Sequence, residues 1–152
     1  MVPNTVERVP LNTSDEINQR IARETNRRVH FYAANPVGID RRLRELDEEW
    51  DIERVLEANA ASAALAGTML AVTVHKRWLM LPGLVAGFLL QHAVQGWCPP
   101  VPILRRMGYR TAREIETERI ALKALRGDFG NIAPGTFERD SAASHALQAA
   151  RL

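Results

Sequence analysis

Two apolar runs occupy the middle of the chain, "ANAASAALAGTMLAVTV" at Ala58–Val74 and "WLMLPGLVAGFLLQHAVQGW" at Trp78–Trp97. They are 17 and 20 residues long, carry no charge, and are separated only by "HKR" at His75–Arg77. Because a helix rises about 1.5 Å per residue, each run spans roughly 25–30 Å, close to the hydrocarbon thickness of a bilayer. The pattern predicts a transmembrane helical hairpin over residues 58–97.

The charged residues lie almost entirely outside this block. The net charge is only +2, and no basic stripe with interleaved aromatic residues is present, so we expect no nucleic-acid partner. The N-terminal part is polar for more than fifty residues, which is atypical of a cleaved secretory signal. The predicted fold class is all-α, an integral membrane two-helix hairpin flanked by cytoplasmic amphipathic helices.

Helical periodicity and capping signals predict the flanking helices. Ile39, Leu43, Leu46 and Trp50 recur on one helical face. A helix with such a face lies on a membrane surface or packs on another helix, and its mixed charges weaken the membrane-surface reading. Thr111 and Glu114 have capping-box spacing, which predicts a helix that runs to Arg126 and stops at Gly127. Thr13 and Glu16 repeat the spacing and predict a helix from near Ser14.

These patterns divide the chain into five segments. They are a polar N-terminal extension with a short helix (1–34), an amphipathic helix (35–57), the transmembrane hairpin (58–97), a Pro-rich exit with an amphipathic helix (98–127) and a flexible C-terminal tail (128–152). Residues 1–12 are expected to form a loose tail.

Small residues recur at four-residue spacing in both apolar runs. The first run has Ala63, Gly67 and Ala71, and the second has Gly83 and Gly87. In a membrane this spacing lets helix backbones approach closely, which predicts a homo-oligomer or another membrane protein as partner. Chance is the alternative, since both runs are rich in alanine and glycine. Trp78 and Trp97 bracket the second run, as expected of interfacial residues.

Cys98 is the only cysteine, so an internal disulfide is excluded. It follows the second run and precedes Pro99 and Pro100, which are expected to end the helix and hold the exit extended. The carbonyls freed near residues 93–96 are expected to meet water or Arg105. A packing role for Cys98 is the leading interpretation. Redox or sulfur-accepting chemistry, and metal or haem ligation together with His92, remain alternatives.

His92 and Gln91 lie inside the second run, where polar groups often mark function. The plainer interpretation is that they bond across the hairpin, for example to Asn59. No Ser/His/Asp set, metal-spaced cluster or glycine-rich phosphate loop is present in the sequence. We therefore expect no catalytic residue, no metal and no cofactor.

The order of three blocks resembles a known family. "NPVGIDRRLR" (Asn35–Arg44) precedes the hairpin, and "GWCPPVPILRRMGYRT" (Gly96–Thr111) follows it. This order resembles the YgaP-like inner-membrane domain family over about half of the chain. The matching residues are Asp40, Arg41, Arg44, Gly96, Cys98, Pro99 and Gly108. The resemblance implies two membrane helices and the bacterial inner membrane, and it implies no activity.

The chain departs from the family by an inserted stretch, Glu45–Glu57, and by long terminal extensions. Some relatives carry a sulfur-transfer domain, but no α/β pattern of that kind is seen here. The expected role is a small non-enzymatic membrane anchor, scaffold or assembly component with both termini cytoplasmic. A sulfur or redox relay through Cys98, and a soluble helical interaction protein, are the alternatives.

Overall fold

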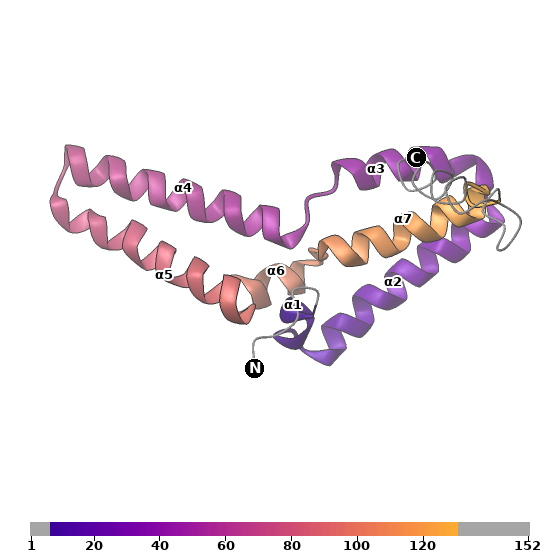
Figure 1. The fold of residues 1–152 in the computed structure, drawn as a ribbon, viewed down its shortest axis with the longest axis horizontal. Helices are drawn as coiled ribbons and strands as arrows, with labels where there is room; N and C mark the ends of the chain where they lie inside the picture. Colours follow the sequence, from indigo (N-terminus) through magenta and orange to yellow (C-terminus); the bar gives the residue numbers. More distant parts are fainter. Residues whose placement is uncertain (1–6, 131–152) are drawn as a thin grey trace, which may run out of the picture. The chain divides into compact units, whose positions relative to one another are not determined.

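The computed structural model describes residues 7–130, and this part of the chain is helical without strands. The all-α prediction is therefore confirmed for these residues. The α-helices are α1 (Arg8–Leu11), α2 (Asp15–Ala34), α3 (Ile39–Glu48), α4 (Ile52–Thr73), α5 (Met80–Gln95), α6 (Val101–Met107) and α7 (Ala112–Arg126), with 3-10 turns η1 (Pro36–Gly38) and η2 (Lys76–Leu79) (Figure 1). Most of the predicted tail, residues 131–152, lies outside the described part.

The described chain divides into two compact units. The first unit comprises the described residues up to Arg23 together with Trp50–Ile115. The second comprises Glu24–Glu49 together with the described residues from Glu116. The hairpin belongs to the first unit, and the long helices α2 and α7 each contribute residues to both.

The hairpin helices α4 and α5 run side by side in Figure 1. Helix α4 is 22 residues long and begins at Ile52, six residues before the predicted apolar run. Asp51 is the N-cap of α4, because its carboxylate accepts a hydrogen bond from the backbone N–H of Arg54 at 2.7 Å. The predicted continuous helix over 35–57 is therefore wrong. The chain is extended at Glu49 and Asp51, which removes Trp50 from the α3 face.

The turn of the hairpin is closed by local bonds and tight packing. His75 Nδ1 accepts from the backbone N–H of Arg77 at 3.0 Å. Pro82 lies in the first turn of α5, where it has no intrahelical donor to lose. A Cβ on Gly67 would lie 2.7 Å from Cδ of Pro82, so the glycine lets the two helices approach.

An apolar core closes the first unit at the open end of the hairpin. Its buried members are Val9, Ile52, Val55, Leu56, Cys98, Val101 and Leu104, with Phe88 and Tyr109 packed against them. Val9 belongs to α1, so the prediction of a loose tail over residues 1–12 is wrong from residue 7 onward. The helix predicted from near Ser14 is present as α2, which begins at Asp15 and, with 20 residues, is longer than the short helix expected within 1–34.

The exit from the hairpin is helical rather than extended. Gly96 ends α5 in the left-handed conformation, with φ of +75°, two residues before Cys98. Pro100 then caps α6, and Pro102 lies in its first turn, where proline is tolerated because the N–H is unused. The predicted extended proline exit is therefore wrong, and Gly96 rather than Pro99 stops the second apolar helix.

Helix α7 begins and ends as predicted. The hydroxyl of Thr111 accepts from the N–H of Glu114 at 3.2 Å, and the carboxylate of Glu114 accepts from the N–H of Thr111 at 2.8 Å. Gly127 follows the last helical residue with φ of +92°. These reciprocal bonds confirm the capping box. The Thr13 hydroxyl instead donates to the Val9 carbonyl at 2.8 Å.

In the second unit, helix α3 buries its apolar residues and forms an ion pair with α7. Ile39, Leu43 and Leu46 are buried, as the periodicity predicted. Glu118 of α7 is fully buried, and its carboxylate accepts from Arg42 Nε at 2.8 Å and from Arg28 Nε at 3.1 Å. The apolar face of α3 is thus buried against protein, which favours packing on another helix over lying on a membrane surface.

Candidate functional site

The outer faces of α4 and α5 form the largest apolar feature of the first unit. Both helical stretches are long and apolar enough to cross a membrane, and only 22% and 6% of their apolar windows are buried. Their large exposed side chains include Leu65, Met69, Val72, Val74, Leu79, Met80, Leu84, Leu90 and Val94. Exposed apolar patches of this extent mark a membrane or a protein interface. Within the described residues, the hairpin is not the buried core of a soluble domain.

The predicted small-residue positions face two different environments. Gly67 and Ala71 are buried inside the hairpin, and Gly67 meets Leu81 and Pro82. A Cβ on Gly83 or Gly87 would meet nothing within 4 Å. The glycines of α5 therefore leave a narrow open strip on its surface.

The remaining predicted positions lie at the pocket and at the helix ends. Ala63 is half-buried and lines a pocket between the helices. Trp78 and Trp97 stay partly exposed near the two ends of α5. This placement is compatible with rings that meet an interface at both ends of the second apolar helix.

Cys98 lies buried in the apolar core, with 5% of its surface exposed. Burial raises the pKa of its thiol, because the thiolate is poorly solvated there. The thiol is thus kept in its neutral, weakly nucleophilic form.

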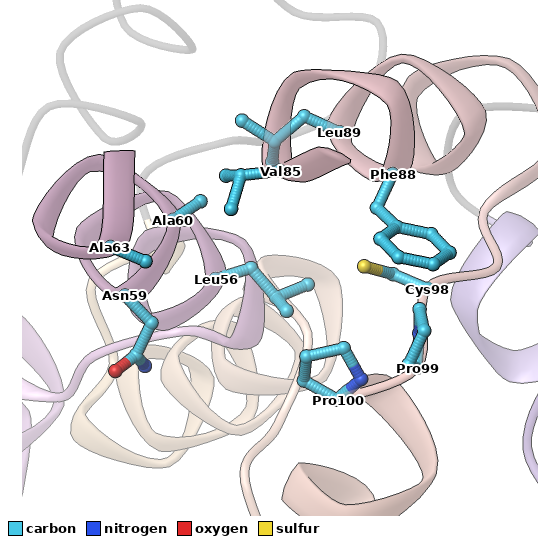
Figure 2. A pocket seen from close by; sticks show the side chains of 10 residues that line it. All are labelled: Leu56, Asn59, Ala60, Ala63, Val85, Phe88, Leu89, Cys98, Pro99 and Pro100. Atoms are coloured by element: carbon cyan, nitrogen blue, oxygen red, sulfur yellow. The ribbon is translucent and has the colours of Figure 1, made fainter. Parts of the chain in front are cut away.

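Figure 2 shows an apolar pocket in which the Cys98 side chain points toward Phe88. Its volume is about 300 Å³. Its lining comes from α4, α5 and the segment before α6: Leu56, Asn59, Ala60, Ala63, Val85, Phe88, Leu89, Cys98, Pro99 and Pro100. The Asn59 amide already donates to the Val55 carbonyl at 2.8 Å. The lining therefore offers almost no polar group to a ligand.

A polar cluster from α1, α4 and α5 lies next to the pocket along the chain. Nε2 of His92 lies 2.7 Å from Oε2 of Glu53, and Arg8 Nη2 lies 3.0 Å from Oε1 of the same carboxylate. His92 therefore bonds across the hairpin as predicted, but its partner is Glu53 rather than Asn59. Glu53 was not among the predicted residues, since it precedes the apolar run and its partners lie 39 and 45 positions away.

The end of α5 is capped by the N-terminal segment. Arg8 Nη1 donates to the Ala93 carbonyl at 3.3 Å, and Asn12 Nδ2 donates to the Gln95 carbonyl at 3.0 Å. The expectation that Arg105 meets these carbonyls is wrong. No local signal in the sequence pointed to Arg8 or Asn12, because they lie more than eighty residues from the groups they satisfy.

Arg105 instead holds α6 to α2 and α7 inside the first unit. Its guanidinium is fully buried and donates to both carboxylate oxygens of Glu114, at 2.7 and 2.8 Å. It also donates to the Asn18 side-chain oxygen at 2.9 Å and to the Tyr109 carbonyl at 3.1 Å. Burial would raise the pKa of Glu114, but the bonds from Arg105 and Thr111 outweigh it and lower that pKa.

The described residues hold no group of three or more His, Cys, Asp or Glu side chains placed to bind a metal ion. The polar residues near Cys98 are paired with one another or with backbone carbonyls, as above. No protein-family model, no curated protein and no solved structure matches the chain. The site is thus characterised by its own geometry: an apolar hairpin, a neutral buried thiol and a polar cluster.

Proposed function

We propose that the chain is a small integral membrane protein of the bacterial inner membrane that acts without catalysis as an anchor, scaffold or assembly component. The observation that carries this proposal is the exposed apolar surface of α4 and α5, which the rest of the described chain leaves uncovered. Lipid is the natural cover for two adjacent helices of this length and composition. The resemblance to the YgaP-like inner-membrane domains supports the same location.

Cell fractionation tests this proposal. The full chain should remain in the membrane pellet after carbonate washing and enter the supernatant only with detergent. Recovery in the supernatant without detergent would favour the alternative, a soluble helical interaction protein whose hairpin is covered by another protein.

The topology is expected to place both termini in the cytoplasm. Arginines lie close to both ends of the hairpin: Arg41, Arg42, Arg44 and Arg54 before it, and Arg105, Arg106, Arg110 and Arg113 after it. The turn offers only Lys76 and Arg77 as positive residues, apart from a histidine. Since positively charged flanks stay inside, Lys76→Cys in a Cys98→Ala background should react with an impermeant maleimide in whole cells.

The matched control for that topology is Ala112→Cys in the same background, an exposed position after the hairpin. It should react only after the cells are permeabilised. The opposite labelling pattern of the two positions would reverse the topology.

Self-association is expected to use the open strip at Gly83 and Gly87. Because nothing in the described chain fills this strip, another helix can approach the α5 backbone closely there. Replacing both glycines with leucine should shift the protein in detergent toward smaller assemblies, measured by sedimentation. The control is Ala66→Leu on the exposed face of α4. If the parent protein, the double leucine variant and the Ala66→Leu variant all have the same size distribution, the strip at Gly83 and Gly87 is not part of the interface.

Cys98→Ala separates the anchor from the sulfur or redox relay. The raised pKa of the buried thiol opposes the relay. On the anchor reading, the substitution removes one sulfur atom from the core, costs about 1 kcal/mol or less, and leaves insertion and complementation of a deletion strain near normal. If the variant inserts and assembles normally but fails to complement the deletion strain, the anchor proposal is contradicted and the relay through Cys98 is supported.

A further inference from the structure

The pocket beside Cys98 is a site that the anchoring role does not require. Its walls are aliphatic or aromatic apart from the thiol and Asn59, and no charged side chain lines it. Its volume of about 300 Å³ reaches the lower end of the range for ligand sites, roughly 300–1,000 Å³. Even an apolar cavity of about 150 Å³ stays free of water and takes up apolar molecules instead. A ligand that fits this lining would therefore be apolar.

The pocket wall on α5 adjoins, along the helix, residues of the surface that we propose to face lipid. Val85 and Leu89 of its wall are sequence neighbours of the exposed Leu84 and Leu90. The pocket is also partly open rather than sealed inside the core. A chain of methylenes that already lies against α5 can thus enter it without crossing a polar layer.

The neighbouring polar cluster indicates the depth at which this apolar wall ends. Glu53 precedes the pocket residue Leu56 by three positions, and His92 follows Phe88 by four, about one helical turn in each case. Arg8 joins both at the same level through the Glu53 carboxylate. An amphipathic molecule at this end of the hairpin would find polar partners beside the pocket and apolar walls within it.

We propose that the pocket binds one acyl chain of a bilayer phospholipid and holds it between α4 and α5. The proposal rests on the membrane location argued above. The acyl chain fills the space between the two helices near their open ends, and the headgroup remains at the level of Arg8. Cys98 serves as part of the wall and does not react with the lipid.

The native thiol gives a direct test, because Cys98 is the only cysteine and lines the pocket. Alkyl methanethiosulfonates of increasing chain length are reacted with the full chain in detergent. The thiolate displaces sulfinate and leaves an alkyl disulfide. If the pocket receives acyl chains, the rate at Cys98 should rise by roughly fourfold for each added methylene until the chain outgrows the pocket.

A control thiol corrects for concentration of the reagents in the micelle. It is Leu90→Cys in a Cys98→Ala background, which places the thiol on the exposed face of α5. The ratio of the Cys98 rate to the control rate should rise with chain length. A ratio that stays constant overturns the proposal, whatever the outcome of the fractionation. Loss of membrane association in fractionation would overturn the proposed location instead, and the two failures are therefore distinguishable.

Two further measurements identify the occupant. Ala63→Leu, which fills the pocket, should flatten the chain-length dependence, whereas Ala66→Leu on the exposed face should not. Dioctanoyl-phosphatidylglycerol added to the micelles should slow disulfide formation between the reagents and Cys98 more than that at the control thiol. If the lipid does not protect Cys98, the proposal is overturned. The proposal is also overturned if protection increases with protein concentration in the absence of added lipid, because a second copy of the chain would then occupy the pocket.

Discussion

Replacing Arg105 with methionine is expected to destabilise the first unit by about 3–5 kcal/mol, the usual cost of removing one partner from a buried ion pair. The guanidinium is fully buried and makes four hydrogen bonds, two of them to Glu114. Methionine keeps an unbranched apolar stem but removes the guanidinium that donates to the Glu114 carboxylate and to the Asn18 oxygen. The free energy of unfolding in detergent, measured by chemical denaturation, reports the loss.

The matched control is Arg106→Met, because Arg106 is the next residue and its side chain is exposed. It should change the free energy of unfolding by no more than about 0.5 kcal/mol. The double variant Arg105→Met with Glu114→Gln should recover part of the loss, since it no longer strands a carboxylate. Equal stability of the two single variants would show that the Arg105 network contributes little.

Replacing Gly96 with alanine is expected to release α1 from the end of α5. Gly96 has φ of +75°, and a Cβ there would lie 2.5 Å from the backbone oxygen of Arg8. The positive φ alone costs about 1–2 kcal/mol for a residue with a Cβ. The collision with backbone adds to this, because neither helix end can yield without breaking the bonds from Arg8 and Asn12.

Gly108→Ala separates the two costs. Gly108 also has a positive φ, of +96°, but a Cβ there would meet nothing within 4 Å. Hydrogen exchange of residues 7–12 should rise strongly in the Gly96 variant and stay near the parent value in the Gly108 variant. If both variants protect these residues equally, α1 is not held by its contact with Gly96.

The parts of the fold that local rules determine were predictable. The capping box at Thr111 and Glu114 and the stop at Gly127 depend on neighbours within four residues, and both are seen. The cap at Asp51 was equally local, but the apolar periodicity that ends at Trp50 concealed it. A periodic face shows where side chains would point if a helix continued, and it does not show that the helix continues.

The candidate site was less predictable because its polar contacts are long-range. Arg8 meets Glu53 across 45 positions, and Arg105 meets Asn18 across 87. The spacing of small residues identified Gly67 and Gly83 alike, but only packing reveals that Gly67 faces its own hairpin while Gly83 remains open. Cys98 was located by its position in the chain, but its burial, which decides its chemistry, occurs in a core that also includes Val9 from the far end of the described chain.

The docking of α1 on the end of α5 has a consequence for biosynthesis. Arg8 and Asn12 leave the ribosome more than eighty residues before the carbonyls of Ala93 and Gln95 that they satisfy. Contacts across so long a stretch of chain form late, since the intervening segment must first be ordered. During synthesis α1 therefore cannot make its contacts with the end of α5 until α5 has been synthesised. Docking of α1 then follows formation of the hairpin.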